Sequence, residues 1–283
     1  MVKTIYDALT YGTDILKENN VESFLSDAKI LLCHILKCDK NYLLVHKNDK
    51  LNKELYSKYK ELINLRADKM PVKYITGICE FYSLDFYVTP DVLIPRPDTE
   101  IIIDKAICEY KKEDNIKILD LCTGSGCIGI SLATQFKKSN VTLVDISKKA
   151  LSVADKNVNK HNLKERIKLI KKDILTDTID EKYDLIVSNP PYINEKDYEN
   201  LEKDVKNYEP KIALLSHDDE YKFYKRIIDV YSKNLNDGGI ILFEMGYNQW
   251  EYLYTYAKQS DIFSNIEIAK DLSGINRVLI LKK

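Results

Sequence analysis

Apolar residues recur at helical spacing through the amino-terminal part of the chain. Within three successive stretches they fall three or four positions apart, as in helices that bury one face. The stretches are Ile5–Leu16, Ala28–Leu36 and Leu55–Ile63. Met70-Pro71 ends the third helix, because a proline restricts the residue before it to extended conformations. The pattern predicts a small helical bundle over residues 1–76.

A different pattern follows the bundle. Residues 81–93 alternate aromatic, β-branched and polar side chains around Leu84-Asp85, as a β-hairpin does. We expect this hairpin to form an ordered linker over residues 77–97. The linker ends in a proline-rich stretch that opens a helix with an acidic first turn.

From residue 115 onward, short apolar runs alternate with stretches of helical spacing. Strands are expected at 117–121, 141–145, 167–171, 183–188 and 240–244. Such alternation predicts an α/β domain, here residues 98–283, with a parallel sheet covered by helices. Two final strands, 263–269 and 277–281, are joined by a turn too short for a parallel crossover, so the last strand should run antiparallel.

Composition narrows the possible functions. The 283 residues are 45% hydrophobic and 31% charged, which is typical of a soluble globular protein. A formal net charge of -1 provides no broad cationic field, so we expect no direct nucleic-acid binding. The 6 cysteines show no paired C-x-x-C spacing, which indicates a reducing cytoplasm and no metal site. No apolar run approaches about 18 residues, so no membrane span is expected.

One predicted strand runs directly into Ser188-Asn189-Pro190-Pro191-Tyr192. The prolines stiffen this turn and leave their carbonyls free to accept hydrogen bonds. The Asn189 oxygen and the Pro190 carbonyl can each accept one N–H of a planar amide or exocyclic amine, while the Tyr192 ring lies against its face. We predict that Asn189, Pro190 and Tyr192 are catalytic and that Pro191 completes the substrate site. The alternative is a rigid turn after a buried strand.

A second candidate site follows the first strand of the α/β part, where Asp120–Gly129 contains G-x-G-x-x-G. Glycines there permit a tight turn and let a ligand approach the backbone. Asp145 ends the next strand and is placed to bind a ribose diol. This pair fits a dinucleotide or S-adenosylmethionine equally well; the antiparallel closing hairpin and the Asn189 turn favour S-adenosylmethionine. The alternative is a tight turn without ligand.

Four more side chains are candidates for contact with a ligand, and two of them have a structural alternative. Asp120 is suited to the ammonium group of a methionine moiety. Asp173 either accepts from an adenine amine or caps a turn, and Ile174 offers an apolar wall for the ring. Arg96 either clamps a substrate or pairs with an acidic neighbour at a helix start.

Several motifs occur in order along almost the whole chain. They are Tyr74-Ile75-Thr76-Gly77, Phe81-Tyr82, Val92–Glu100, Asp120–Gly129, Ser188–Tyr192, Tyr208-Glu209-Pro210 and Gly274–Val278. Together they resemble the bacterial and organellar peptide chain release factor glutamine methyltransferases. Ile94–Glu100 is the sharpest marker, because Asn-Pro-Pro-Tyr is shared with adenine and cytosine amino-methylases.

The resemblance implies a class I S-adenosylmethionine-dependent methyltransferase fold: a Rossmann-like seven-stranded sheet with an antiparallel last strand, preceded by the helical bundle. We expect that bundle to be a substrate-docking domain, because a pocket for one amide cannot distinguish one protein glutamine from another and the ordered hairpin should hold the bundle in a fixed position. It implies methyl transfer to the N5 nitrogen of the glutamine in the Gly-Gly-Gln loop of class I release factors, leaving S-adenosylhomocysteine. The cofactor site would comprise Asp120, Cys122, Thr123, Gly124, Ser125, Gly126, Asp145, Asp173, Ile174 and Asn189. We expect a cytoplasmic monomer. The alternatives are an adenine or cytosine amino-methylase, a ribosomal-protein glutamine methylase, and a cofactor-binding scaffold without turnover.

The chain departs from the family pattern at two places. Cys122 stands where the family commonly has glycine, and a small side chain should be tolerated there if φ is negative. Ser216-His217 replaces a more usual Gly-Gly turn, which leaves the geometry of that loop open.

Overall fold

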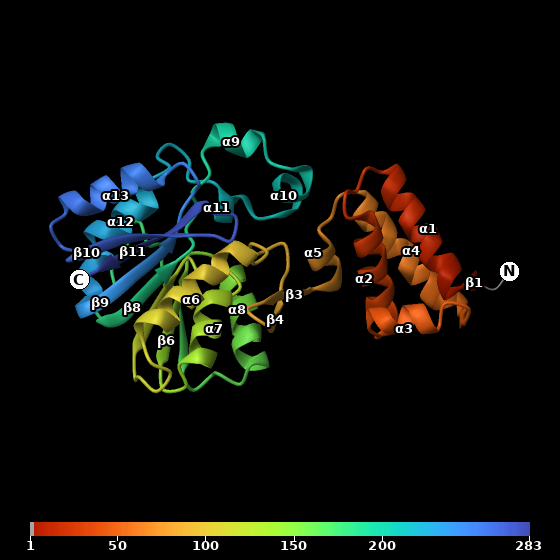
Figure 1. The fold of residues 1–283 in the computed structure, drawn as a ribbon, viewed down its shortest axis with the longest axis horizontal. Helices are drawn as coiled ribbons and strands as arrows, with labels where there is room; N and C mark the ends of the chain where they lie inside the picture. Colours follow the sequence, from red (N-terminus) through yellow and green to blue (C-terminus); the bar gives the residue numbers. More distant parts are fainter. Residues whose placement is uncertain (1–2) are drawn as a thin grey trace. The chain divides into compact units, whose positions relative to one another are not determined.

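The computed structural model describes residues 3–283, so the first two residues of the predicted bundle lie outside it (Figure 1). The chain forms two compact units. The helical unit comprises the described residues up to Ile78 together with Glu202–Tyr208. The sheet unit comprises Cys79–Leu201 and Glu209–Lys283.

The helical unit is built from short and medium helices around one apolar core. They are α1 (Ile5–Glu18), α2 (Phe24–Leu36), α3 (Lys40–Val45), α4 (Lys53–Ala67) and α5 (Val72–Thr76), with β1 (Lys3–Thr4) paired to β2 (Lys50–Leu51). Leu16, Leu31, Tyr59 and Ile63 are fully buried between α1, α2 and α4. The predicted stop at Pro71 begins a further helix, because Pro71 is the N-cap of α5.

One segment from the second half of the chain also belongs to the helical unit. Helix α10 (Lys203–Tyr208) is held there by Arg66, whose Nη1 lies 2.7 Å from Asp204 Oδ2. The Nε of Arg66 donates to Asp27 Oδ2 at 2.7 Å, and the Tyr208 hydroxyl donates to the Asp68 carbonyl at 2.7 Å. The sequence pattern does not predict that α10 belongs to the helical unit, since nothing local distinguishes α10 from its neighbours.

The hairpin linking the units consists of β3 (Ile78–Phe81) and β4 (Leu84–Tyr87). Its turn residues Tyr82 and Ser83 have φ of 50° and 58°. Positive φ at both central residues is the type I′ turn geometry, for which Asn-Gly is the usual sequence. The predicted turn at Leu84-Asp85 is therefore wrong by two residues, because that sequence signal is missing.

The sheet unit contains a seven-stranded sheet in the order β10-β11-β9-β8-β5-β6-β7. The strands are β5 (Lys117–Leu121), β6 (Asn140–Asp145), β7 (Ile167–Lys171), β8 (Tyr183–Ser188), β9 (Leu235–Glu244), β10 (Asn265–Lys270) and β11 (Asn276–Lys282). Neighbours from β7 to β9 pair in parallel, and β11 is antiparallel to both β9 and β10. The predicted α/β class and the antiparallel last strand are confirmed.

Helices cover both faces of this sheet (Figure 1). One face carries α6 (Glu100–Glu109), α7 (Cys127–Gln135) and α8 (Lys148–Lys160), and the other carries α12 (Lys222–Asp229) and α13 (Trp250–Gln259). The shorter elements are η1 (Pro97–Thr99), α9 (Glu195–Glu199), α11 (Lys211–Leu214) and η2 (Tyr231–Asn234). Because the parallel strands all end at one edge, the loops that follow them converge there.

Candidate active site

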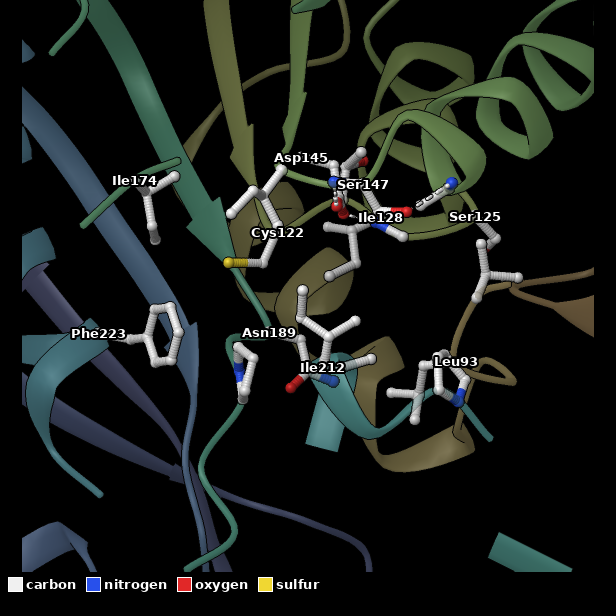
Figure 2. A pocket seen from close by; sticks show the side chains of 18 of the residues that line it. Leu93, Cys122, Ser125, Ile128, Asp145, Ser147, Ile174, Asn189, Ile212 and Phe223 are labelled. Carbon is white, nitrogen blue, oxygen red and sulfur yellow. Dashed lines mark hydrogen bonds between the residues drawn. The ribbon is translucent and has the colours of Figure 1, made fainter. Parts of the chain in front are cut away.

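A cavity of about 280 Å³ opens at the carboxyl ends of the parallel strands (Figure 2). It lies where β5 sits between β6 and β8, so that the strand order reverses at β5. Such a switch point leaves a crevice, because the connections on its two sides run over opposite faces of the sheet. Cys122, Asp145 and Asn189, which follow or end these three strands, all line the cavity.

The loop after β5 turns tightly against the sheet. Gly124 and Gly126 have φ of 56° and 81°, the left-handed region that favours glycine. The Thr123 N–H donates to the Val144 carbonyl at 3.0 Å, which anchors the loop to β6. A Cβ at Gly126 would lie 2.9 Å from Ile130 Cδ1, whereas one at Gly124 would meet nothing within 4 Å. Gly124 therefore faces the open cavity, and Gly126 packs against Ile130 of α7 and Leu143 of β6.

Cys122 has φ of 59°, so the negative φ under which a small side chain would be tolerated there is not met. The residue thus adopts the left-handed backbone conformation, which costs about 1–2 kcal/mol for any residue that carries a Cβ. The side chain points into the cavity (Figure 2). Burial raises the pKa of the thiol well above its ordinary value, so the thiol is protonated at neutral pH. Cys122 is accordingly a cavity wall and not a nucleophile.

Asp145 spans the glycine loop and the start of α8. One carboxylate oxygen accepts from the Gly124 N–H at 2.9 Å, and the other accepts from the Ser147 N–H at 2.8 Å. Burial raises the pKa of this carboxyl, and the backbone N–H groups oppose that shift. Since a carboxylate has about four lone-pair sites, capacity remains to accept from the hydroxyls of a ribose in the cavity.

Two polar atoms beneath the glycine loop have no hydrogen-bond partner among the described residues. They are Asp120 Oδ1 and Ser125 Oγ, and both side chains are buried. Asp120 Oδ2 accepts from the Thr123 hydroxyl at 2.5 Å and from the Gly129 N–H at 3.0 Å. Ser125 lines the cavity, whereas Asp120 lies behind the wall. Buried polar groups are rarely left unpaired, so Ser125 Oγ on the cavity wall fits a ligand with a polar group at this end of the cavity.

Asp173 and Ile174 follow β7 and line the cavity. Asp173 Oδ1 accepts from the Leu175 N–H at 2.9 Å, so its side chain does cap a turn; contact with an adenine amine stays a prediction. Ile174 and Phe223 form an apolar wall on one side of the cavity (Figure 2). Phe223 belongs to α12 and was not anticipated from the sequence.

Asn189 is held by a chain of hydrogen bonds. Its Nδ2 donates to Thr99 Oγ1 at 3.2 Å, and the Thr99 hydroxyl donates to Glu244 Oε2 at 2.5 Å. The Tyr192 hydroxyl donates to the second oxygen of Glu244 at 3.4 Å. Asn189 and Pro191 line the cavity, but Pro190 and Tyr192 are not among its lining residues. Tyr192 therefore lies behind the cavity wall with its hydroxyl bonded to Glu244, and its contact with a substrate stays a prediction.

Residues after Tyr208 close one side of the cavity. Buried Glu209 accepts from the Ile94 N–H at 3.1 Å and forms an ion pair with Arg96. Arg96 thus pairs with a carboxylate more than a hundred positions away in the sequence, not with a neighbour. This latch places Pro210 and Ile212 on the cavity wall.

Residues 3–283 contain neither a metal-binding cluster nor a membrane-spanning helix. No group of three or more His, Cys, Asp or Glu side chains there is arranged to hold a metal ion. In that same range, no helix combines the length and apolar character needed to cross a lipid bilayer.

Comparison with known proteins identifies the family. The PrmC N-terminal domain matches residues 7–77, and the Methyltransferase small domain matches residues 105–205. The release factor glutamine methyltransferase of Clostridium acetobutylicum is 41% identical over 279 residues, which cover 98% of this chain and 97% of that protein. Its counterpart in Clostridium botulinum is also 41% identical, over 98% of each chain.

The chain belongs to the release factor glutamine methyltransferase family. The resemblance inferred from the motifs is confirmed. A methyltransferase from Pyrococcus furiosus aligns with a TM-score of 0.52 at 19% identity, covering 80% of this chain and 98% of that one. At that identity the likeness bears on the fold alone. With the matched domain and the strand order, it shows the class I methyltransferase fold.

The second departure from the family pattern is accommodated by the backbone. At Ser216-His217, the Ser216 N–H and hydroxyl both donate to the Ile193 carbonyl, at 2.9 and 3.0 Å. His217 has φ of 56° and lines the cavity. A histidine therefore adopts the left-handed conformation that a glycine would adopt more easily.

Sequence reasoning missed two residues that are hydrogen-bonded to the Asn189 turn, Thr99 and Glu244. A signal existed for each. Thr99 lies within the marker stretch Ile94–Glu100, and Glu244 ends the strand that pairs with β8. An acidic residue at the carboxyl end of a strand beside the Asn189 turn was a candidate for contact with it.

Proposed function

We propose that this member of the family transfers a methyl group from S-adenosylmethionine to the N5 nitrogen of the glutamine in the Gly-Gly-Gln loop of class I release factors. The observation that carries the proposal is one cavity lined both by the glycine loop with Asp145 and by Asn189 with Pro191. The first pair suits a nucleoside, and the second suits an N–H-bearing acceptor. Relatives over almost the whole chain are named release factor glutamine methyltransferases, which supports this choice of substrate.

The cofactor end of the cavity follows from the donors and acceptors already described. Asp145 would hold the ribose hydroxyls, Ile174 and Phe223 would flank the adenine, and Asp173 would accept from its amine. Ser125 Oγ, which has no hydrogen-bond partner among the described residues and lines the cavity, fits the amino acid end of the cofactor, and Asp120 supports the glycine loop from behind it. When bound, S-adenosylmethionine supplies an electrophilic methyl group on its sulfonium.

The acceptor end must activate a poor nucleophile. An amide nitrogen shares its lone pair with the carbonyl, and no side-chain base beside Asn189 can fully deprotonate it. Asn189 Oδ1 and the Pro190 carbonyl would each accept one N–H of the glutamine side chain, which fixes the nitrogen and favours slight pyramidalisation toward the methyl group. The N–C bond would form as the methyl–sulfur bond broke, the sulfur would keep that bonding pair, and the nitrogen would release one proton during or after transfer.

We also propose that the helical unit docks the body of the release factor. A pocket that recognises one amide cannot distinguish one protein glutamine from another, so selectivity needs a second contact. Helix α3 exposes Leu44 and Val45 with 68% and 78% of their surface accessible, beside partly exposed Tyr42. Exposed apolar side chains gathered on one short helix are typical of a protein-binding surface.

A methylation assay with labelled S-adenosylmethionine tests the function. We expect label in an intact class I release factor and in a Gly-Gly-Gln peptide, and none in DNA or ribosomal protein. Asn189→Ala should reduce kcat by about two to four orders of magnitude, the effect of losing a positioning contact, while cofactor affinity changes only a few-fold. Asn159→Ala, an exposed helix position, is the matched control. Labelling of DNA instead would support an amino-methylase, and near-normal turnover by Asn189→Ala would remove Asn189 from the site.

A further inference from the structure

Glu244 is a buried carboxylate that the proposed reaction leaves without a role. It is 3% exposed at the end of β9, and Thr99 in front of it is 2% exposed. Burial raises the pKa of Glu244, while the Thr99 hydroxyl, the Arg277 guanidinium and the Tyr192 hydroxyl oppose that shift. Burying a carboxylate costs folding free energy unless hydrogen bonds or an opposite charge compensate it. Thr99 lines the cavity and is hydrogen-bonded to Asn189, and Tyr192 belongs to the turn that begins at Asn189.

The direction of the hydrogen bonds determines which end of Asn189 faces the cavity. The Arg277 guanidinium and the Thr99 and Tyr192 hydroxyls favour the ionised form of Glu244, and in that form the carboxylate can only accept, so it takes the single proton of the Thr99 hydroxyl. The remaining lone pairs of that hydroxyl can also only accept, and Nδ2 of Asn189 is the group that donates to them. The carboxamide therefore cannot exchange its two ends without placing Oδ1 against another acceptor.

The same chain affects how strongly Oδ1 accepts. Hydrogen bonds polarise one another in series, and bonds to an ionised partner are about twice as strong as neutral ones. The charge on Glu244 thus increases the partial negative charge on Asn189 Oδ1. A substrate nitrogen becomes positive as its new bond forms, so a stronger acceptor there stabilises the transition state more than the ground state.

We propose that Thr99 and Glu244 are positioning residues that lock the Asn189 carboxamide with Oδ1 toward the cavity and so select an acceptor that presents N–H groups. The inference rests on the proposed function and extends it to two residues outside the Asn-Pro-Pro-Tyr motif. It assigns the buried charge a role in kcat and in substrate class. A purely structural role, tying α6 to β8 and β9, is the competing explanation.

The test uses the full-length protein and the Gly-Gly-Gln peptide. Thr99→Val removes the hydroxyl at nearly constant shape, and Thr99→Ser keeps it. We expect Thr99→Val to lower kcat by about ten- to a hundredfold, the usual effect of removing a partner that orients an active-site ligand, with the cofactor Kd unchanged. Thr99→Ser should restore most of that loss. Glu244→Gln, which removes the charge, should lower kcat about tenfold. Thr142→Val is the matched control, since Thr142 is buried, accepts from the Tyr183 hydroxyl at 3.3 Å and lies outside the cavity wall.

A double-mutant cycle distinguishes positioning from structure. If Thr99 acts through Asn189, adding Thr99→Val to Asn189→Ala should cost less than about threefold, because the group it orients is already gone. Equal losses in both backgrounds, or equal activity of Thr99→Val and Thr99→Ser, would overturn the inference while wild-type methylation still supported the proposed function. No labelling of peptide or release factor by the wild-type protein would overturn the proposed function and this inference with it.

Discussion

Alanine at Gly126 should act mainly on stability, whereas alanine at Gly124 should act mainly on cofactor binding. Both glycines have positive φ, so each alanine incurs the left-handed cost of about 1–2 kcal/mol. Because alanine lowers the conformational entropy of the unfolded chain, it offsets about 0.4–1 kcal/mol of that cost. Backbone strain alone thus lowers the free energy of unfolding by about 1 kcal/mol at either position.

Packing separates the two variants. At Gly126 the new Cβ would approach Ile130 Cδ1 to 2.9 Å and Leu143 Cδ1 to 3.3 Å, so overpacking adds about 1–3 kcal/mol. The expected total for Gly126→Ala is about 2–4 kcal/mol. At Gly124 the Cβ meets nothing within 4 Å and projects into the cavity instead. Gly124→Ala should therefore weaken S-adenosylmethionine binding by about tenfold or more, because 1.4 kcal/mol of lost contact is a factor of ten.

Urea unfolding at constant m gives the stabilities, and calorimetric titration gives the cofactor Kd. Gly238→Ala is the matched control, since Gly238 has φ of 76°, no atom within 4 Å of its Cβ, and no place on the cavity wall. It should lose about 1 kcal/mol and bind the cofactor normally. Equal destabilisation of Gly124→Ala and Gly126→Ala, or a larger loss of affinity in Gly126→Ala, would refute the division between cavity and packing.

Three further results are expected. Asp145→Ala should raise the cofactor Kd more than it lowers kcat at saturation, because a ribose contact is made equally in ground and transition states; an unchanged Kd by calorimetry would exclude Asp145 from the site. Burial raises the pKa of Asp120 from 3.8 to about 7, so its contribution to stability is complete below pH 3.8 and is lost as pH rises through about 7. The free energy of unfolding without cofactor should fall with a slope of up to about 1.4 kcal/mol per pH unit across that window, and wild-type and Asp120→Asn curves that stay parallel would contradict this assignment. Leu44→Ser with Val45→Ser should raise KM for the intact release factor severalfold and leave the peptide unaffected, whereas equal changes for both substrates would argue against docking on α3.

Local sequence determined the elements and most of the proposed cofactor site. Periodicity separates helices from strands because side chains must reach a core at intervals of 3.6 or 2 residues. The glycine loop, Asp145 and the Asn189 turn follow strands that end at one edge, so their meeting in one cavity followed from a parallel sheet. The short final connection fixed the direction of β11 by chain length alone.

Tertiary structure alone decided which distant residues support those motifs. Thr99 reaches Asn189 and Glu244 across 90 and 145 positions, which depends on η1 lying over the ends of β8 and β9. The latch of Glu209 on Arg96 and the left-handed backbone at Cys122 likewise have no local signal. Such contacts depend on strand order and on which loop packs over which strand end, and periodicity contains no information about either. The sequence therefore indicates most of the groups that line the cavity, and the folded chain determines how the Asn189 carboxamide is oriented.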